Sequence, residues 1–228
     1  MNNLKENLDN VSSRVKSACE DAGREFSEVR ILAVSKRHPA CRVEALHKYG
    51  QTAFGENVVA EALGKISALS RLELEWHFIG QVQSNKTRDI ANSFSWVQSV
   101  DRARILRRLS DQRPVQMPSI NVCLQVNIDN EPQKAGCSEA EVVELAELAR
   151  DLPGIRLRGL MAIPGIDEAT GCTAKQSFVR MKSLFQDCLT RGFEMDTLSM
   201  GMSADLEQAI SAGSTMVRIG TDIFGPRP

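Results

Sequence analysis

The sequence lacks an apolar run long enough to cross a membrane, and it lacks the apolar segment of a signal peptide. Its first ten residues, MNNLKENLDN, are polar. It also lacks an excess of charge of one sign, since 28 Lys and Arg balance 29 Asp and Glu to a net charge of −1. No overall field would attract nucleic acid or an anionic membrane. These absences predict a cytoplasmic protein with neither nucleic acid nor membrane as a partner.

Paired cysteines are missing as well. The chain has 6 cysteines, but they are scattered and none forms a CxxC pair. A zinc site or a disulfide framework requires a closer and more regular spacing. We therefore expect reduced thiols and no metal site. The cysteines are Cys19, Cys41, Cys123, Cys137, Cys172 and Cys188.

What the sequence does have is an alternation of helical patterns and short apolar runs. An amphipathic helix is expected within residues 1–24, where Leu4, Leu8, Val11 and Val15 recur at helical spacing. Several of the following runs are apolar on successive residues, as in strands that are buried on both faces of a parallel sheet. The predicted strands are 29–36, 52–57, 75–80, 96–100, 119–127, 155–163, 197–202 and 216–221.

Helical patterns fill the gaps between these runs. Ser138 and Glu141 form a capping-box pair, and Asp101 and Ser203 stand where two other helices are expected to begin. The predicted helices follow Pro39 and cover about 57–69, 85–93, the segment from Asp101, 138–151, 173–191 and 203–212.

Eight strands with helices between them predict an α/β fold, a single (β/α)8 TIM-type barrel. We expect one domain over residues 1–228, with the helix of residues 1–24 packed on the barrel. An open doubly wound sheet is the alternative, because a sequence cannot show that a sheet closes. The barrel is favoured because eight strands in a chain of 228 residues leave room for little else.

Lys36 follows a nearly unbroken apolar strand, at the end where barrels carry their active sites. Partial desolvation there would lower the pKa of its amine and make it able to form a Schiff base. The alternative is a lysine that points from the strand end into water, as most lysines do.

Two glycine-containing segments near the end of the chain predict a phosphate site. Gly201 and Ser203 open a helix after the seventh strand, and Gly220 and Thr221 follow the eighth. Barrels commonly bind phosphate between these two loops. Such residues are also ordinary turn and cap residues. Together, however, a lysine and a phosphate site match the two ends of pyridoxal 5'-phosphate.

Arg218 lies within the eighth strand, among apolar residues and glycine. Inside the barrel it could face the pyridine nitrogen of that cofactor. A permanent cation there disfavours a proton on the nitrogen and weakens the ring as an electron sink. On the outside it would instead pair with an acidic residue of a helix.

At these residues the sequence resembles the pyridoxal phosphate homeostasis protein family, with motifs in the right order over nearly the whole chain. They are LAVSK (32–36), FGEN (54–57), WHFIGQVQSNK (76–86), RGLMAIP (158–164), LSMGMSADLEQAI (198–210) and VRIGTDIFGPR (217–227). The resemblance implies a fold-type III barrel, similar to the N-terminal domain of alanine racemase. It also implies a carrier or regulator of the cofactor in vitamin B6 homeostasis, without firmly established catalysis.

For the site, the resemblance implies pyridoxal phosphate held as an aldimine on Lys36. It further implies that Arg218 lies near the pyridine nitrogen. The remaining residues that it implies are Ser203, Gly220 and Thr221 at the phosphate, and Asn57, Met200 and Gly201 along the cofactor.

The residues argue for a carrier without catalytic residues, and against a racemase. Racemisation needs two bases on opposite faces of the cofactor. The one tyrosine, Tyr49, is expected near the opposite rim of the barrel, and His77 within a strand is read as structural. Partners would be the cofactor and possibly pyridoxal phosphate-dependent apoenzymes, and the chain is expected to be a monomer. A Schiff-base aldolase with Glu56 or Asp101 as acid or base is a third reading.

Overall fold

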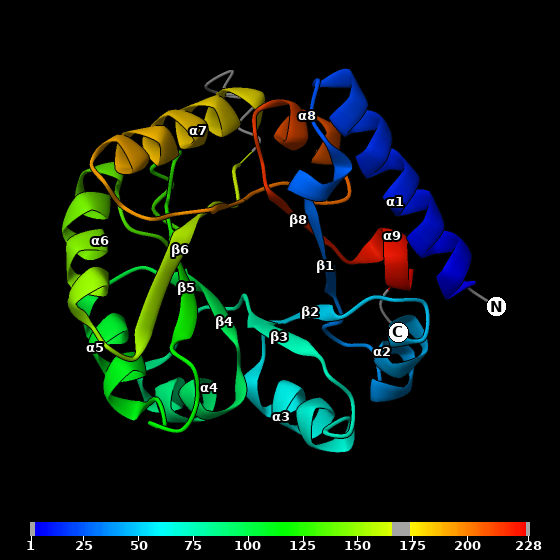
Figure 1. Cartoon of the computed structure of the whole chain (residues 1–228), viewed down its shortest axis with the longest axis horizontal. Helices are drawn as coiled ribbons and strands as arrows, with labels where there is room; N and C mark the ends of the chain where they lie inside the picture. The colour runs from blue at the N-terminus through cyan, green and yellow to red at the C-terminus, as the bar shows by residue number, and fades with distance from the viewer. Residues whose placement is uncertain (1–2, 166–173, 227–228) are drawn as a thin grey trace.

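The computed structural model describes residues 3–165 and 174–226. Eight parallel strands pair in sequence order, and the eighth also pairs with the first, so the sheet is a closed barrel (Figure 1). The barrel prediction is confirmed, and the open sheet is wrong. The strands are β1 (Arg30–Val34), β2 (Ala53–Glu56), β3 (Glu75–Phe78), β4 (Trp96–Val100), β5 (Ile120–Gln125), β6 (Ile155–Met161), β7 (Thr197–Ser199) and β8 (Met216–Ile219).

Helices surround this barrel (Figure 1). They are α1 (Leu4–Asp21), α2 (Ala40–His47), α3 (Val59–Ala68), α4 (Thr87–Ser93), α5 (Ala103–Gln112), α6 (Val142–Asp151), α7 (Ala174–Thr190), α8 (Leu206–Ser211) and α9 (Thr221–Phe224), with short 3-10 helices at Phe26–Glu28, Ser84–Lys86 and Glu139–Glu141. The predicted capping box of Ser138 and Glu141 is present. The predicted helix 173–191 corresponds to α7, although residue 173 lies outside the described residues.

The first helix lies along the outside of the barrel, next to α8 and α9 (Figure 1). Arg14 of α1 holds this contact, because its guanidinium donates to Glu207 Oε1 at 2.9 Å and to Asp222 Oδ2 at 2.5 Å. Its Nη2 also donates to the backbone carbonyl of Ser203 at 2.9 Å. The helix is therefore tied to the segments that follow β7 and β8.

The predicted boundaries were wrong mainly where strands end. Thr221 begins α9 and does not continue β8, and the helix after β7 begins at Leu206, not at Ser203. The Asp205 carboxylate accepts from the Met202 N–H at 2.6 Å, so Asp205 organises the turn that precedes this helix. Likewise, the N-cap of α5 is Arg102 and not Asp101. Polar residues at strand ends belong to the loops of the carboxyl rim, which apolar patterning does not resolve.

Alternate residues of each strand face the barrel interior or the helices. Most of the buried apolar residues form one cluster that includes the strand residues Phe54, Val97 and Leu198 and the helix residues packed on them. The interior holds two small apolar clusters, one around Leu32 and Met216 and one formed by Trp96, Cys123 and Met161. The rest of the interior, described below, is polar.

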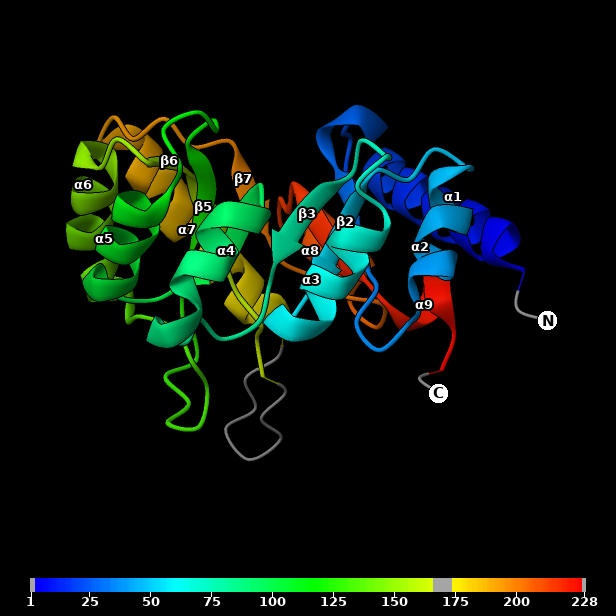
Figure 2. The same ribbon diagram turned by 90° about the horizontal axis from the view of Figure 1, so that it is seen from below.

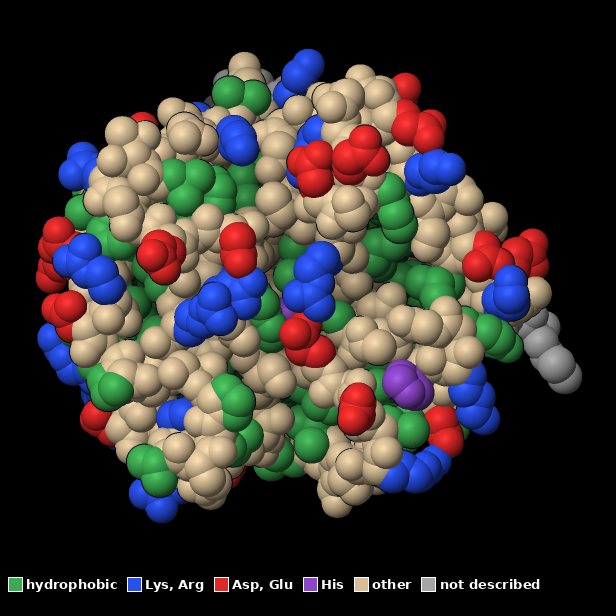
Figure 3. Space-filling model, viewed as in Figure 1, with side chains coloured by type: hydrophobic (Ala, Val, Ile, Leu, Met, Phe, Trp, Pro, Cys, Tyr) green, Lys and Arg blue, Asp and Glu red, His purple; other side chains and the backbone are tan. Residues whose placement is uncertain are grey.

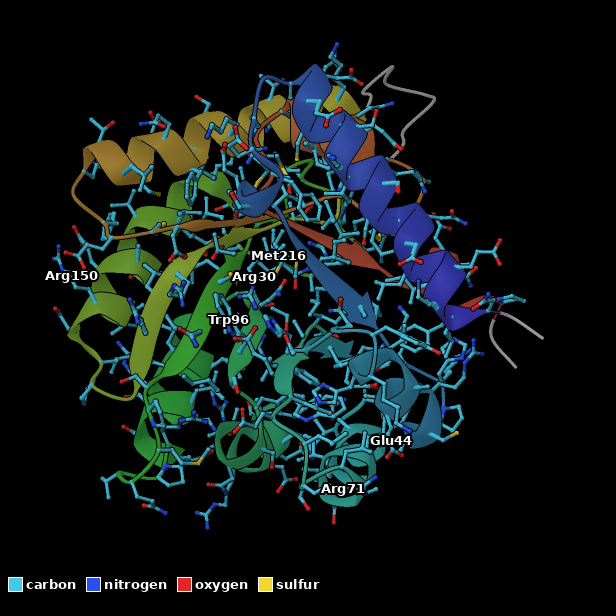
Figure 4. The ribbon with its side chains drawn as sticks, turned by 45° about the vertical axis from the view of Figure 1, so that its right-hand side comes forward. Arg30, Glu44, Arg71, Trp96, Arg150 and Met216 are labelled. Atoms are coloured by element: carbon cyan, nitrogen blue, oxygen red, sulfur yellow. The ribbon has the colours of Figure 1, made fainter. Side chains whose placement is uncertain are left out.

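The two faces of the barrel differ. Figure 2 shows the loop that follows β5 projecting beyond the ring of helices, on the side of the strands' carboxyl ends. Figure 3 looks onto the opposite face, where Lys, Arg, Asp and Glu side chains gather around the centre. Arg30, Trp96 and Met216, the first residues of β1, β4 and β8, lie together at this end (Figure 4). Within the described residues, no helix is long and apolar enough to span a bilayer, and no group of acidic, His and Cys side chains could hold a metal ion.

Candidate cofactor site

A cavity of about 390 Å³ opens at the carboxyl ends of the strands and includes Lys36. Its volume is in the range of pockets that bind small molecules. Six of the eight predicted cofactor residues line it, namely Lys36, Asn57, Ser203, Arg218, Gly220 and Thr221. Residues that the sequence analysis missed complete the wall: Val34, Ile79, Gly80, Ile163, Met202 and Ala204.

The turn that carries Lys36 is held from the helix side of the sheet. The Ser35 hydroxyl donates to Glu56 Oε1 at 2.5 Å, and Lys65 Nζ of α3 donates to the Ser35 carbonyl at 2.7 Å. On the other side of Lys36, the Arg37 N–H donates to Glu61 Oε1 at 2.6 Å. Arg37 has a φ of 65°, a left-handed conformation that costs a non-glycine residue energy and must be stabilised by its surroundings.

Lys65 and Glu56 form a buried ion pair behind this turn. Their side chains are 7% and 0% exposed, and Lys65 Nζ lies 2.6 Å from Glu56 Oε1 and 2.7 Å from Glu61 Oε1. Burial raises the pKa of Glu56, whereas hydrogen bonds from Lys65 and Ser35 oppose that rise. We call Glu56, Glu61 and Lys65 the acidic clamp. Glu56 faces the helices and not the cavity, so it is badly placed as the acid or base of an aldolase, and Asp101 instead accepts from Arg102.

Arg218 forms the inner wall of the cavity and is 4% exposed. Its Nη1 donates to the Ser199 carbonyl at 2.8 Å and to the Ser199 hydroxyl at 2.9 Å, and its Nη2 donates to the Ala162 carbonyl at 2.9 Å. Burial lowers its pKa to about 10, so it stays a cation at neutral pH. The prediction that Arg218 lies inside the barrel is confirmed, and the alternative of an outward arginine paired with a helix acid is wrong.

Two glycines allow segments at the carboxyl rim of the barrel to pack closely against their neighbours. A Cβ on Gly80 would lie 2.2 Å from the Asn57 carbonyl oxygen, and one on Gly201 would lie 2.5 Å from Ala209 Cβ. Gly201 also has a φ of +95°. Met200 is fully buried and, like Gly201, is not among the residues that line the cavity. Gly201 acts beneath the site, since its carbonyl accepts from the Arg218 N–H at 3.0 Å.

Tyr49 and His77 lie away from the cavity. Tyr49 is half exposed and lines a separate depression with Arg30 and Thr52, near the amino ends of the strands. His77 is fully buried inside the barrel, where its ring stacks on Trp96 with centroids 5.0 Å apart. The structural reading of His77 is confirmed.

Comparison with known proteins decides the family. Residues 3–228 match the model of the alanine racemase N-terminal domain. The pyridoxal phosphate homeostasis protein of Pseudomonas aeruginosa is 52% identical over 229 residues, which cover 100% of this chain and 97% of the relative. The chain belongs to the pyridoxal phosphate homeostasis protein family. The Escherichia coli member is 46% identical over 230 residues, with 100% of this chain and 98% of the relative covered.

Solved structures agree with this family membership. PipY of Synechococcus elongatus, solved with pyridoxal phosphate bound, superposes with a TM-score of 0.82 at 31% identity, covering 97% of this chain and 100% of PipY. Alanine racemase of Clostridium difficile has a TM-score of 0.77 at 17% identity, covering 100% of this chain and 58% of the racemase. The racemase likeness shows the shared barrel fold and nothing about activity.

Proposed function

We propose that this protein binds pyridoxal 5'-phosphate in the cavity at Lys36 and serves vitamin B6 homeostasis as a carrier or regulator. The observation that carries the proposal is that one cavity combines the amine of Lys36, the guanidinium of Arg218 and the hydroxyls of Ser203 and Thr221. PipY with bound pyridoxal phosphate and the names of the relatives support it.

The residues present fit the cofactor. Bound pyridoxal phosphate supplies an aldehyde that bonds to an amine and a ring that withdraws electrons. Lys36 is the amine, positioned by the acidic clamp behind its turn. Ser203, Gly220 and Thr221 would hold the phosphate through hydroxyl and backbone N–H donors, and Asn57, on the same cavity wall, would contact the rest of the cofactor. Met200 and Gly201 support this wall from below.

Arg218 gives the physical reason for binding without turnover. A guanidinium at this position would disfavour a proton on the pyridine nitrogen of the bound cofactor, and such a proton strengthens the ring as an electron sink. Neither Tyr49 nor His77 lines the cavity, so neither supplies the second base that racemisation needs. The relatives' names, which are those of homeostasis proteins and not of enzymes, agree with this account.

The proposed function also includes the location of the protein and the recipient of its cofactor. We place the protein in the cytoplasm, as one domain over residues 1–228 and as a monomer that passes its cofactor to pyridoxal phosphate-dependent apoenzymes. A carrier would release cofactor to an apoenzyme faster than it loses cofactor to buffer. Mixing the loaded protein with a pyridoxal phosphate-free aminotransferase, and comparing recovery of activity with the rate of cofactor loss in dialysis, tests this. Equal rates would argue for a regulator that does not transfer by contact.

A further inference from the structure

A row of polar side chains crosses the barrel interior from Arg218 to the opposite face. Arg218 Nη1 donates to Ser199 Oγ at 2.9 Å, and that hydroxyl donates to Gln98 Oε1 at 2.7 Å. The Gln98 amide nitrogen then lies 2.9 Å from His77 Nδ1, and His77 Nε2 lies 2.7 Å from Glu75 Oε1. Four strands, β8, β7, β4 and β3, therefore contribute to one row.

The chemistry of the two ends fixes the direction of every bond in this row. A guanidinium can only donate, so Ser199 Oγ accepts from Arg218 and has one proton to give to the carbonyl oxygen of Gln98. The Gln98 amide must then donate its N–H to His77 Nδ1, which leaves the histidine proton on Nε2, facing the Glu75 carboxylate. All bonds thus run from Arg218 toward Glu75, an arrangement in which hydrogen bonds strengthen one another.

The far end of the row is also held by charge. Glu75 Oε1 accepts from Arg30 Nη2 at 2.7 Å, and against the effect of its burial the hydrogen bonds from His77 and Arg30 and the charge of Arg30 lower the pKa of Glu75. Burial lowers the pKa of His77, which keeps its ring neutral, as the bond from Gln98 requires. Arg30 lies at the amino-end face of the barrel with Trp96 and Met216 (Figure 4).

We propose that Gln98 and Ser199 are positioning residues that hold the Arg218 guanidinium at the cofactor cavity, through a one-directional hydrogen-bond chain that ends on Glu75. Both side chains are buried, and neither lines the cavity, so they act on the cofactor through Arg218. This inference rests on the proposed binding of pyridoxal phosphate. It gives a reason for polar residues in a barrel interior that apolar residues usually fill.

The direction of the chain can be measured without cofactor. The chain has 3 histidines, so ¹⁵N-resolved NMR of the ring nitrogens, with His38→Asn and His47→Gln for assignment, isolates the signals of His77. We expect a neutral ring with its proton on Nε2 between pH 7 and pH 8. A proton on Nδ1 in this range would overturn the proposed chain, even if every variant below failed to fold.

The positioning role is tested by Gln98→Met and Ser199→Ala, with Gln51→Met as the matched control. Gln51 is a nearly buried glutamine of the same barrel, and its amide donates to the Ile31 and Ala53 carbonyls, away from the chain and the cavity. For both test variants we expect loss of bound pyridoxal phosphate to be about tenfold faster, the scale of one lost buried hydrogen bond, with a shifted pH profile of its visible absorbance.

The outcomes separate two failures. If wild type binds pyridoxal phosphate, and Gln98→Met and Ser199→Ala retain it and absorb as Gln51→Met does, the positioning role is wrong and the proposed function stands. If wild type takes up no pyridoxal phosphate, the proposed function fails, and the role of the chain in holding the cofactor fails with it. Partial recovery of the wild-type profile in Ser199→Thr, which keeps a hydroxyl, would support the role of that hydroxyl.

Discussion

Two buried cations lie near the cavity at Lys36, and they are held in opposite ways. Lys65 lies behind the Lys36 turn and is bonded to two carboxylates, those of Glu56 and Glu61. Arg218 forms the inner wall and is bonded to the Ser199 carbonyl and hydroxyl and the Ala162 carbonyl, with no acidic partner at salt-bridge distance among the described residues.

The comparison separates a cation that is paired within the protein from a cation whose charge is available to a ligand in the cavity. The charge of Lys65 is neutralised by the two carboxylates, so Lys65 can hold a backbone turn but attracts no ligand. Neutral acceptors orient Arg218 and leave its charge uncancelled, so it can act on what enters the cavity.

Lys65→Met should produce the largest loss of stability, because it leaves Glu56 as an uncompensated charge in a buried position. We expect the free energy of unfolding to fall by about 3–5 kcal/mol at pH 7, measured by urea titration. The pKa of Glu56 is already raised by burial, so its neutral form is favoured as pH falls, and the loss should be smaller at pH 5. Lys16→Met, at a 67% exposed lysine of α1, is the control. Equal effects of the two substitutions would contradict the acidic clamp.

Arg218→Met should cost less stability, because it leaves polar groups unpaired but leaves no buried charge without a partner. About 1–3 kcal/mol is expected from the unpaired Ser199 and Ala162 acceptors, with the same value at pH 5 and pH 8. Its larger effect should be a changed absorbance of bound pyridoxal phosphate. A pH-dependent loss like that of Lys65→Met would mean that an acid partners Arg218 after all.

Glu61→Gln should weaken the hold on the Lys36 turn with a small effect on the fold. The amide oxygen can still accept from the Arg37 N–H, but the charge that faces Lys65 is lost. We expect a loss of about 1 kcal/mol in unfolding and faster release of pyridoxal phosphate in dialysis. Release at the wild-type rate would show that the turn holds its shape without this carboxylate.

Glu75→Gln should cause the smallest loss in the free energy of unfolding, and this loss should depend on pH in the acidic range. Against the effect of burial, the hydrogen bonds to Glu75 and the charge of Arg30 lower the pKa of this carboxyl, so its charged form contributes stability above the ordinary carboxyl pKa of 4.5, and that stability is lost as the pH falls through the lowered pKa. The difference from wild type, about 1 kcal/mol at pH 7, should therefore shrink steadily below pH 4. A difference that stays constant down to pH 2 would contradict the bond between Glu75 and neutral His77.

The sequence predicted the barrel and six of the residues that line the cavity at Lys36, for physical reasons. Buried strands need successive apolar residues, so all eight strands could be placed. Lys36 and Arg218 stood out because charges within or just after such strands must have a role. Closure of the barrel could not be predicted, because it rests on pairing between Arg30 and Met216, which lie at opposite ends of the chain.

The supporting residues were missed because their partners are set by three-dimensional packing. Lys65 in a helix reads as a solvated lysine, and only the packing of α3 on β2 places it against Glu56. Gln98 and Ser199 left a weak signal, since each is a polar residue in an otherwise apolar strand. Their hydrogen bond joins residues that are 101 positions apart, a contact that no local pattern contains.

Absorbance combined with chemical reduction would show whether pyridoxal phosphate is attached to Lys36. The protein would be loaded with pyridoxal phosphate, its visible spectrum recorded before and after borohydride, and the modified peptide identified by mass. We expect a yellow protein whose colour is lost on reduction, with the cofactor fixed on Lys36, and a Lys36→Ala variant without the visible band. A wild type that stays colourless after loading, or a label on Lys65 in place of Lys36, would contradict it.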